Sequence, residues 1–274
     1  MLRVTSIIVA LLAMVAESHA GGTIAITACG QAVPPGYKAV LMNDIVCPPW
    51  GVCYPPSPCA PPGVPCQPIQ PTVACRAVAE CPDPAHDTCD PPPGKNGSIG
   101  LVLGRGARLE MNSHSLSGSY YGLVSGTFDS SGQLVSAGKM TIKGPGAIFQ
   151  TQEAGFAVSV KAEGISIHGN PLGFWANRID AKNLVGSANG VFLVAERSIK
   201  ASGLAVTGGE YGVISDGSAK ISDSSITGST AGDIETVSRP RVRNVVCDHS
   251  AQLVPTGQPG HSAVGPPWGV CSGD

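Results

Sequence analysis

Five short segments with the same residue pattern follow one another in the second half of the chain, and their starts are 19, 20, 20 and 21 residues apart. They read VKAEGISI (160–167), IDAKNLVG (179–186), IKASGLAV (199–206), AKISDSSI (219–226) and PRVRNVVC (240–247). Their first and third positions are small or apolar, and the position between them is polar. Alternation over a short run indicates a β-strand, and recurrence at a fixed spacing indicates stacked repeats. The pattern predicts a parallel β-solenoid whose coils contain about 20 residues.

A second sequence marker supports the same fold. A glycine followed by two strand-forming residues recurs at Gly173, Gly190, Gly212 and Gly232, and we interpret each coil as having two strand segments joined by polar corners. A β-sandwich would require turn signals every 8–12 residues instead. A leucine-rich repeat would require leucines at fixed offsets, which the segments lack.

Length and composition limit the class of protein. The chain has 274 residues, 36 of them glycine, with only 13% charged and 5% aromatic residues, which suits one large all-β domain. The formal net charge of −2 gives no reason to expect a nucleic acid as partner.

The organisation along the chain follows from shifts in composition. We expect a signal peptide at 1–20, an N-terminal cap segment at 21–47, a Cys/Pro-rich insert at 48–98, the β-helix at 99–248, and a C-terminal tail and cap at 249–274. The first segment has a positive start at Arg3, a short apolar stretch and small residues before its end. This predicts a secreted protein, extracellular or periplasmic, with no membrane contact after cleavage; the sequence does not predict its oligomeric state.

Ten cysteines, an even number, suit an oxidising compartment. Their spacings do not match those of zinc knuckles, so we expect disulfides and no metal. A solenoid exposes both ends of its stack, so we predict that Cys29–Cys47 and Cys247–Cys271 close the two ends and that the other six cysteines pair within the insert. In the alternative, Cys271 pairs with a cysteine of the insert, which would bring together the two copies of PPWGVC at 48–53 and 266–271.

Segments ahead of the repeats carry a family resemblance. CGQAVPPGYKAVLMNDIVC (29–47), IGLVLGRGARLEMNSHSLSG (99–118) and MTIKGPGAI (140–148) resemble the entry region of secreted bacterial right-handed parallel β-helix proteins of the pectate-lyase-like superfamily. The resemblance implies an all-β, right-handed parallel β-helix. It also raises polysaccharide cleavage as a hypothesis, although this fold hosts many functions.

The catalytic patterns that the resemblance suggests are absent from the sequence. Pectin hydrolases of this fold carry NTD, DD, GHG and RIK motifs, and none occurs here. Pectate lyases require clustered carboxylates for Ca²⁺, whereas the acids of these coils are scattered. Asp233 and Glu235, two residues apart on one strand, are the only catalytic candidates. We therefore expect no cofactor, with Ca²⁺ required only if the protein is a lyase.

The polar positions between the apolar ones are rich in cations. Stacking places them in columns with a spacing of about 4.8 Å, in which lysine and arginine predominate over acids. We interpret them as a solvated ladder or as a groove for an anionic polysaccharide, which would be bound by Lys161, Lys182, Lys200, Lys220, Arg241, Arg243 and Trp175. Phe174, Trp175 and Phe192 lie on neighbouring coils and either pack in the core or stack on sugar rings.

The sequence thus predicts a secreted, non-catalytic β-helix protein that binds carbohydrate or serves as an extracellular structural module. The first alternative is a polysaccharide lyase or glycoside hydrolase acting on an acidic polysaccharide. The second is adhesion through the Cys/Pro-rich insert.

Overall fold

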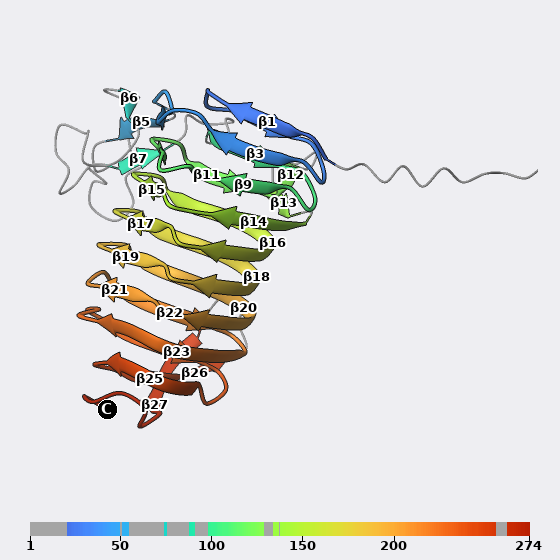
Figure 1. The fold of residues 1–274 in the computed structure, drawn as a ribbon. Helices are drawn as coiled ribbons and strands as arrows, with labels where there is room; N and C mark the ends of the chain where they lie inside the picture. The colour runs from blue at the N-terminus through green and yellow to red at the C-terminus, as the bar shows by residue number, and fades with distance from the viewer. Residues whose placement is uncertain are drawn as a thin grey trace, which may run out of the picture.

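The structure is a computed structural model, and it describes residues 21–49, 51–54, 74–75, 88–90, 98–128, 134–136, 138–255 and 262–274. These residues contain strands, turns and bends and no helix. The strands stack coil upon coil into an elongated parallel β-solenoid (Figure 1). The predicted fold class, an all-β parallel β-helix with coils of about 20 residues, is confirmed. The expected signal peptide at 1–20 lies outside the described residues.

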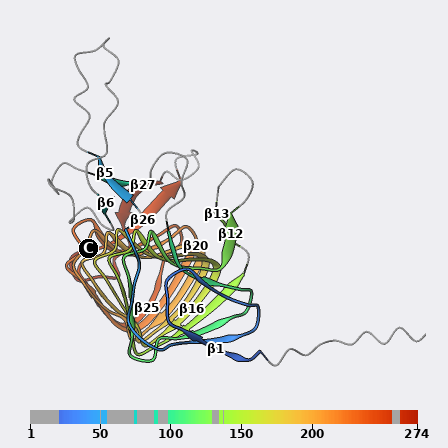
Figure 2. The ribbon, with the colours of Figure 1, turned by 90° about the horizontal axis from the view of Figure 1, so that it is seen from above.

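Each coil contributes to three parallel sheets, which form three faces of the solenoid (Figure 2). The first face contains β2 (Gln31–Val33), β8 (Ile99–Leu103), β11 (Tyr121–Val124), the first halves of β16 (Glu153–Glu163), β18 (Leu172–Lys182) and β20 (Val191–Ser202), then β22 (Tyr211–Ser215), β24 (Gly232–Thr236) and β26 (Ser250–Pro255). The second face contains β1 (Thr23–Ile26), β3 (Lys38–Leu41), β9 (Arg108–Glu110), β14 (Lys139–Lys143), the second halves of β16, β18 and β20, and the first halves of β23 (Ser218–Thr227) and β25 (Arg241–Cys247). The third face contains β4 (Ile45–Val46), β10 (Ser115–Ser117), β15 (Ala147–Phe149), β17 (Ser166–His168), β19 (Val185–Ser187), β21 (Ala205–Thr207) and the second halves of β23 and β25.

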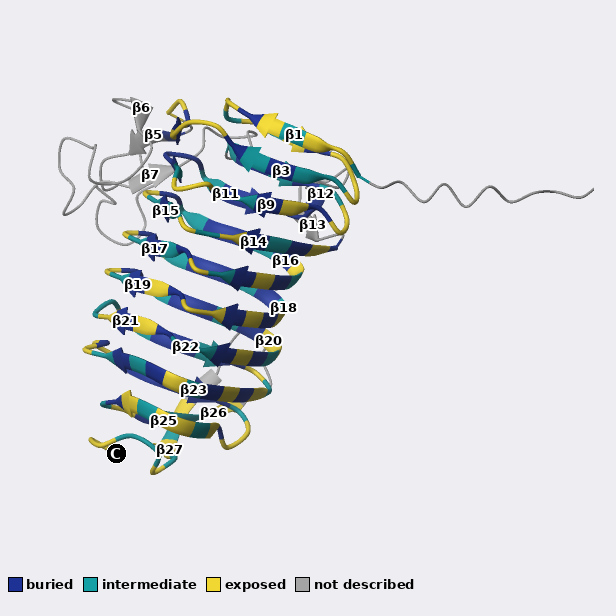
Figure 3. Ribbon diagram, viewed as in Figure 1, coloured by how far each residue is buried: buried dark blue, intermediate teal, exposed yellow. Residues whose placement is uncertain are grey.

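The register of the second face is the one that the sequence repeat predicts. Val160 pairs with Ile179, which pairs with Ile199, and the alanines at 162, 181 and 201 form the next column. These apolar columns are buried in the interior, while the polar residues between them face solvent (Figure 3). Small side chains suffice because each one stacks on its neighbours in the coils above and below.

The glycine marker, in contrast, was placed in the wrong register. Gly173 pairs with Phe192 and not with Gly190, because Leu172 is the partner of Val191. The Phe192 ring points into the core, where it lies beside Gly186, and a Cβ at that glycine would lie 2.5 Å from the ring. The expectation of two strand segments per coil holds in the middle of the stack, where each coil is formed by one strand pair: β16 and β17, β18 and β19, or β20 and β21. The first strand of each pair spans two faces, whereas the first coils have three shorter strands, such as β2, β3 and β4.

The corner between the third and first faces holds a buried ladder of polar side chains. The Asn170 Oδ1 atom accepts hydrogen bonds from the backbone N–H and the hydroxyl of Thr151, at 2.9 Å each. The Asn189 Oδ1 atom accepts in the same way from the backbone and side-chain amides of Asn170. Each asparagine also donates to a backbone carbonyl, Asn170 to Ile148 and Asn189 to Ile167. The ladder satisfies backbone groups that the corner would otherwise leave unpaired.

The segment expected as an N-terminal cap forms the first coil of the solenoid itself. Its strands β2, β3 and β4 pair with β8, β9 and β10 of the next coil. The predicted Cys29–Cys47 disulfide is present and joins the two ends of this coil, with a Cα–Cα distance of 5.3 Å.

Two excursions leave the coils. The insert contains the short strands β5 (Gly51–Tyr54), β6 (Ala74–Cys75) and β7 (Thr88–Asp90), which form a separate antiparallel sheet. The side chains of its six cysteines lie outside the described residues. The second excursion is the hairpin of β12 (Gly126–Phe128) and β13 (Leu134–Ser136), at the corner between the first and second faces.

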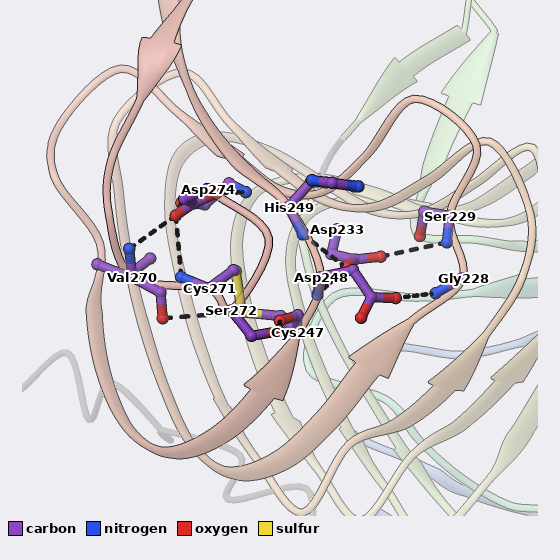
Figure 4. The surroundings of a disulfide bond; sticks show 11 residues. Gly228, Ser229, Asp233, Cys247, Asp248, His249, Val270, Cys271, Ser272 and Asp274 are labelled. Atoms are coloured by element: carbon purple, nitrogen blue, oxygen red, sulfur yellow. Dashed lines mark hydrogen bonds between the residues drawn. A yellow bond between two sulfur atoms is a disulfide. The ribbon is translucent and has the colours of Figure 1, made fainter.

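The C-terminal tail closes the last coil, as predicted, through a Cys247–Cys271 disulfide (Figure 4). Before it, β26 pairs antiparallel with β27 (Ser262–Pro267). The Ser272 and Gly273 amides donate to the carbonyls of Cys247 and Asp248. The Asp274 carboxylate accepts from the amides of Ser250, Val270 and Cys271. The tail therefore takes the place of a next coil along this stretch of the edge.

Candidate functional site: a basic groove on the second face

The second face carries columns of charged side chains because its strands alternate strictly between core and solvent. In β16, β18, β20 and β23 the alternation buries an alanine or isoleucine and exposes the residues on either side of it. One outer column runs through Lys161, Asp180, Lys200, Lys220 and Arg241. The next column on the same face runs through Glu163, Lys182, Ser202, Ser222 and Arg243.

A groove of about 650 Å³ follows these two columns across five strands. All six cations that the sequence predicted as ligand-binding residues line it: Lys161, Lys182, Lys200, Lys220, Arg241 and Arg243. Ser202 and Ser222 lie between them and offer hydroxyl groups. The structure therefore brings together at one site the residues that the repeat placed in register.

Trp175 does not line this groove. It lies in the first half of β18 and packs edge-on against Phe156, with ring centroids 5.3 Å apart, on the first face. The strand register shifts between Ala176 and Arg178, where the chain passes from the first face to the second. Phe174 and Phe192 are fully buried, so they belong to the core.

The second face collects the basic residues of the whole solenoid. Every lysine among the described residues lies on one of its strands: Lys38, Lys139, Lys143, Lys161, Lys182, Lys200 and Lys220. The arginines of the same part of the chain lie on these strands or just before them, at 105, 108, 178, 197, 239, 241 and 243. A chain with a net charge of −2 therefore presents one strongly basic face.

The acids on this face neutralise only part of its charge. Glu163 forms an ion pair of 3.1 Å with Lys182, and the hydrogen bond from this lysine lowers the pKa of the carboxyl group. Lys38 pairs with Glu110 at 2.8 Å, and Arg243 pairs with Asp223 at 3.3 Å. These exposed pairs contribute little stability, on the order of 0–1 kcal/mol each.

Lys200, Lys220 and Arg241 occupy directly neighbouring positions on three consecutive strands. Within the described part of the chain, none of the three has an ion-pair partner, and neither does Asp180. Like charges directly opposite each other on paired strands repel. Asp180, the neighbour of Lys200 in the column, is the acid nearest to this run of cations in the register. A bound polyanion would reduce the remaining repulsion between the three cations.

A second groove of about 600 Å³ continues along the same face toward the N-terminal end. It is lined in part by Lys38, Arg108 and Lys143. On β14, Thr141 pairs with Lys161 and so belongs to the first outer column, while Lys143 pairs with Glu163 and belongs to the second. The basic face therefore extends beyond the predicted residues to the first coil.

The two candidate catalytic acids are buried and lie away from this groove. Asp233 is fully buried, and its carboxylate accepts hydrogen bonds from the amides of Ser229, Asp248 and His249 (Figure 4). Glu235 is 2% exposed in the outer column of the first face, and burial raises the pKa of its carboxyl group. Asp233 thus holds the turns of the last coil together.

One acidic residue was missed at the sequence level. Glu153 lies beside Tyr121 in an outer column of the first face, and burial raises the pKa of its carboxyl group to about 7. Its Oε2 atom is inaccessible to solvent and has no hydrogen-bond partner in the described structure. The repeat alignment begins at residue 160, so it contains no signal for this site.

The described residues include no group of three or more His, Cys, Asp or Glu side chains arranged to hold a metal ion. They also include no helix that is long and apolar enough to cross a membrane. No known protein family matches the chain, and no curated protein or solved structure is significantly similar to it. The resemblance to the pectate-lyase-like superfamily remains a prediction from the quoted motifs.

Proposed function

We propose that the protein is an exported, non-catalytic β-solenoid that binds an anionic polysaccharide along its second face. The single observation that carries the proposal is the run of Lys200, Lys220 and Arg241, which forms no ion pair with any described residue and lies in a groove of about 650 Å³. An extended polymer with regularly spaced carboxylate or sulfate groups matches a column of cations that are about 4.8 Å apart.

The composition of the groove supports a carbohydrate ligand. Ser202 and Ser222 continue the second column beside the cations and supply hydrogen-bonding groups for hydroxyls. Lysine side chains present mobile point charges, which suit a polymer of variable conformation better than a rigid bidentate site does.

A binding role without catalysis is supported by the small number of unpaired carboxyl groups in the groove. General acid–base cleavage of a glycosidic bond requires two carboxyl groups that flank the bond. In the groove, Glu163 is held in an ion pair with Lys182, which leaves Asp180 as the unpaired carboxylate. The Cys29–Cys47 and Cys247–Cys271 disulfides support a location in an oxidising compartment, as expected for an exported protein.

The test compares binding to immobilised polygalacturonate, alginate and neutral dextran at several salt concentrations. We expect binding to the two acidic polymers only, weakening as salt screens the charges. The triple variant Lys200→Gln, Lys220→Gln, Arg241→Gln should bind roughly one hundredfold more weakly, if each cation near an anionic surface contributes about 1 kcal/mol.

The matched control is the triple variant Lys200→Arg, Lys220→Arg, Arg241→Lys, which keeps all three positive charges in the groove and should change binding little. Reaction mixtures are assayed for unsaturated and reducing ends, with and without Ca²⁺. Equal binding of polyglutamate, retention of binding in the triple variant, or turnover of either polymer would overturn the proposal.

A further inference from the structure

The two ends of the second face differ in how they terminate. At the C-terminal end, β25 carries Arg241 and Arg243, follows Pro240, and is flanked by the tail that the Cys247–Cys271 disulfide holds in place. At the N-terminal end, β1 is the outermost strand, and no described strand pairs with its outer edge.

The hydrogen bonds of β1 show which of its backbone groups face outward. The carbonyls of Gly22 and Ile26 accept from the amides of Lys38 and Met42, on the β3 side. Because the backbone groups of a strand alternate in direction, Thr23 and Ala25 direct their N–H and C=O groups to the open side. This edge therefore offers a row of backbone donors and acceptors to another strand.

The side chains of β1 lack the features that usually prevent an edge strand from pairing with another strand. Its sequence TIAI has no charge and no proline, although natural edge strands are normally guarded by charges, prolines or bulges. Ile24 ends the interior column that continues through Ala39 and Leu109, and it stays partly exposed at the end of the core. Met42, at the end of β3, is 52% exposed. The first coil thus presents both an open edge and apolar surface.

We infer that two copies of this chain associate head to head, with β1 of one copy pairing antiparallel with β1 of the other. Tail-to-tail pairing would place Arg241 and Arg243 of each copy against those of the other copy. Head-to-tail stacking would require the first coil of one copy to occupy the place where the C-terminal tail lies on the other.

The symmetry of this pairing fixes the orientation of the two basic faces. Adjacent antiparallel strands in a sheet are related by a twofold axis perpendicular to the sheet, and such a closed, isologous contact does not propagate into fibres. The second faces of both copies therefore point in the same direction and form one continuous sheet. Repulsion at the junction is small, because Thr23, Ala25 and Val40 are uncharged and Lys38 is paired with Glu110.

The experiment is a measurement of molar mass by light scattering after size exclusion, supported by sedimentation over a range of concentrations. Wild-type protein should have twice the mass of one chain and dissociate on dilution. The double variant Thr23→Asp, Ala25→Asp should have the mass of a single chain, because like charges would face each other across the twofold axis. Both side chains are exposed, so thermal unfolding of the isolated chain should change little.

The matched control is Ala205→Asp, Thr207→Asp, which places the same charges on two exposed residues of β21, a strand in the middle of the stack. It should remain dimeric. A second variant, Ala25→Pro, removes one outward N–H group at the edge and should also be monomeric. A wild-type protein that is monomeric at every concentration, or a dimer that persists in both edge variants, would overturn the inference.

Discussion

Neighbouring residues on the second face have opposite environments, and Ile199 and Lys200 are the clearest case. The Ile199 side chain is 2% exposed in an interior column, while Lys200 faces the groove. Ile199→Asp should reduce the free energy of unfolding by about 3 kcal/mol or more, because it buries a carboxyl group without a partner. Lys200→Asp should change it by less than about 0.5 kcal/mol, as is usual for exposed sites. Equal effects of the two substitutions in urea unfolding would show that the register is wrong.

Glu153 makes a second prediction at the residue scale, because burial raises its pKa from 4.5 to about 7. Between these two values the native state holds a proton that the unfolded chain releases. The free energy of unfolding should therefore fall as the pH rises through this window, by an amount on the order of 1–3 kcal/mol.

Urea unfolding of the wild type and of Glu153→Gln across this pH range measures the effect. The difference between the two proteins should grow in favour of Glu153→Gln as the pH rises, and should level off above the native pKa. A difference that does not vary with pH would contradict the assigned environment of Glu153.

At the scale of one structural element, the asparagine ladder makes the clearest prediction. Asn170→Ala would remove hydrogen bonds to the Thr151 amide and the Ile148 carbonyl, both of which remain at the buried corner. An unsatisfied buried group costs about 1–3 kcal/mol, so we expect the variant to lose roughly 2–4 kcal/mol in thermal or urea unfolding. Ser187→Ala, on the adjacent β19, is the control and should have little effect. If the two variants melt alike, the ladder contributes no stability.

The second face shows how much of the structure could be predicted from the sequence. Residues alternate with period two on the second face, and successive coils there differ in length by one residue at most, so aligning Val160, Ile179 and Ile199 predicts the observed register. The positions of the six groove cations followed directly from it. The asparagines at 170 and 189 share the same 19-residue offset, so the repeat spacing does carry a signal for the ladder.

The first face could not be predicted in the same way. Two successive positions, Phe192 and Leu193, are both buried there, so strict alternation fails within the strand. Gly190 and Gly173 therefore looked equivalent although they lie two positions apart in register. Trp175 is outside the groove for a related reason. It precedes the point between Ala176 and Arg178 at which the chain passes from the first face to the second. Which face a residue joins depends on where the chain turns, and local periodicity does not specify that turn.

For the whole molecule, the disulfide at the C-terminal end predicts the stability of the last coil. It joins cysteines 24 residues apart and holds the tail against β25. Replacing Cys247 and Cys271 by serine should lower the free energy of unfolding by about 3 kcal/mol by the loop-closure estimate.

Amide hydrogen exchange shows which strands lose stability when the disulfide is removed. Amides of β25 and β26 should exchange faster in the double serine variant, while those of β18, in the middle of the stack, should exchange as in the wild type at rates set by their own neighbours. Ser272→Ala, which removes one hydroxyl contact to the Cys247 carbonyl, should behave nearly as the wild type does. Uniformly faster exchange along the chain would argue against a local role of the bridge.

We expect the collection of cations on the second face to give the molecule a permanent dipole moment that points away from its long axis. With a formal net charge of −2, the chain should migrate in an electric field as a weak anion. Near a negatively charged surface, however, it should rotate until the second face meets that surface, because orientation depends on the distribution of charge and not on its sum. The protein should thus be retained by a sulfonate resin at a pH at which its net charge alone would exclude it.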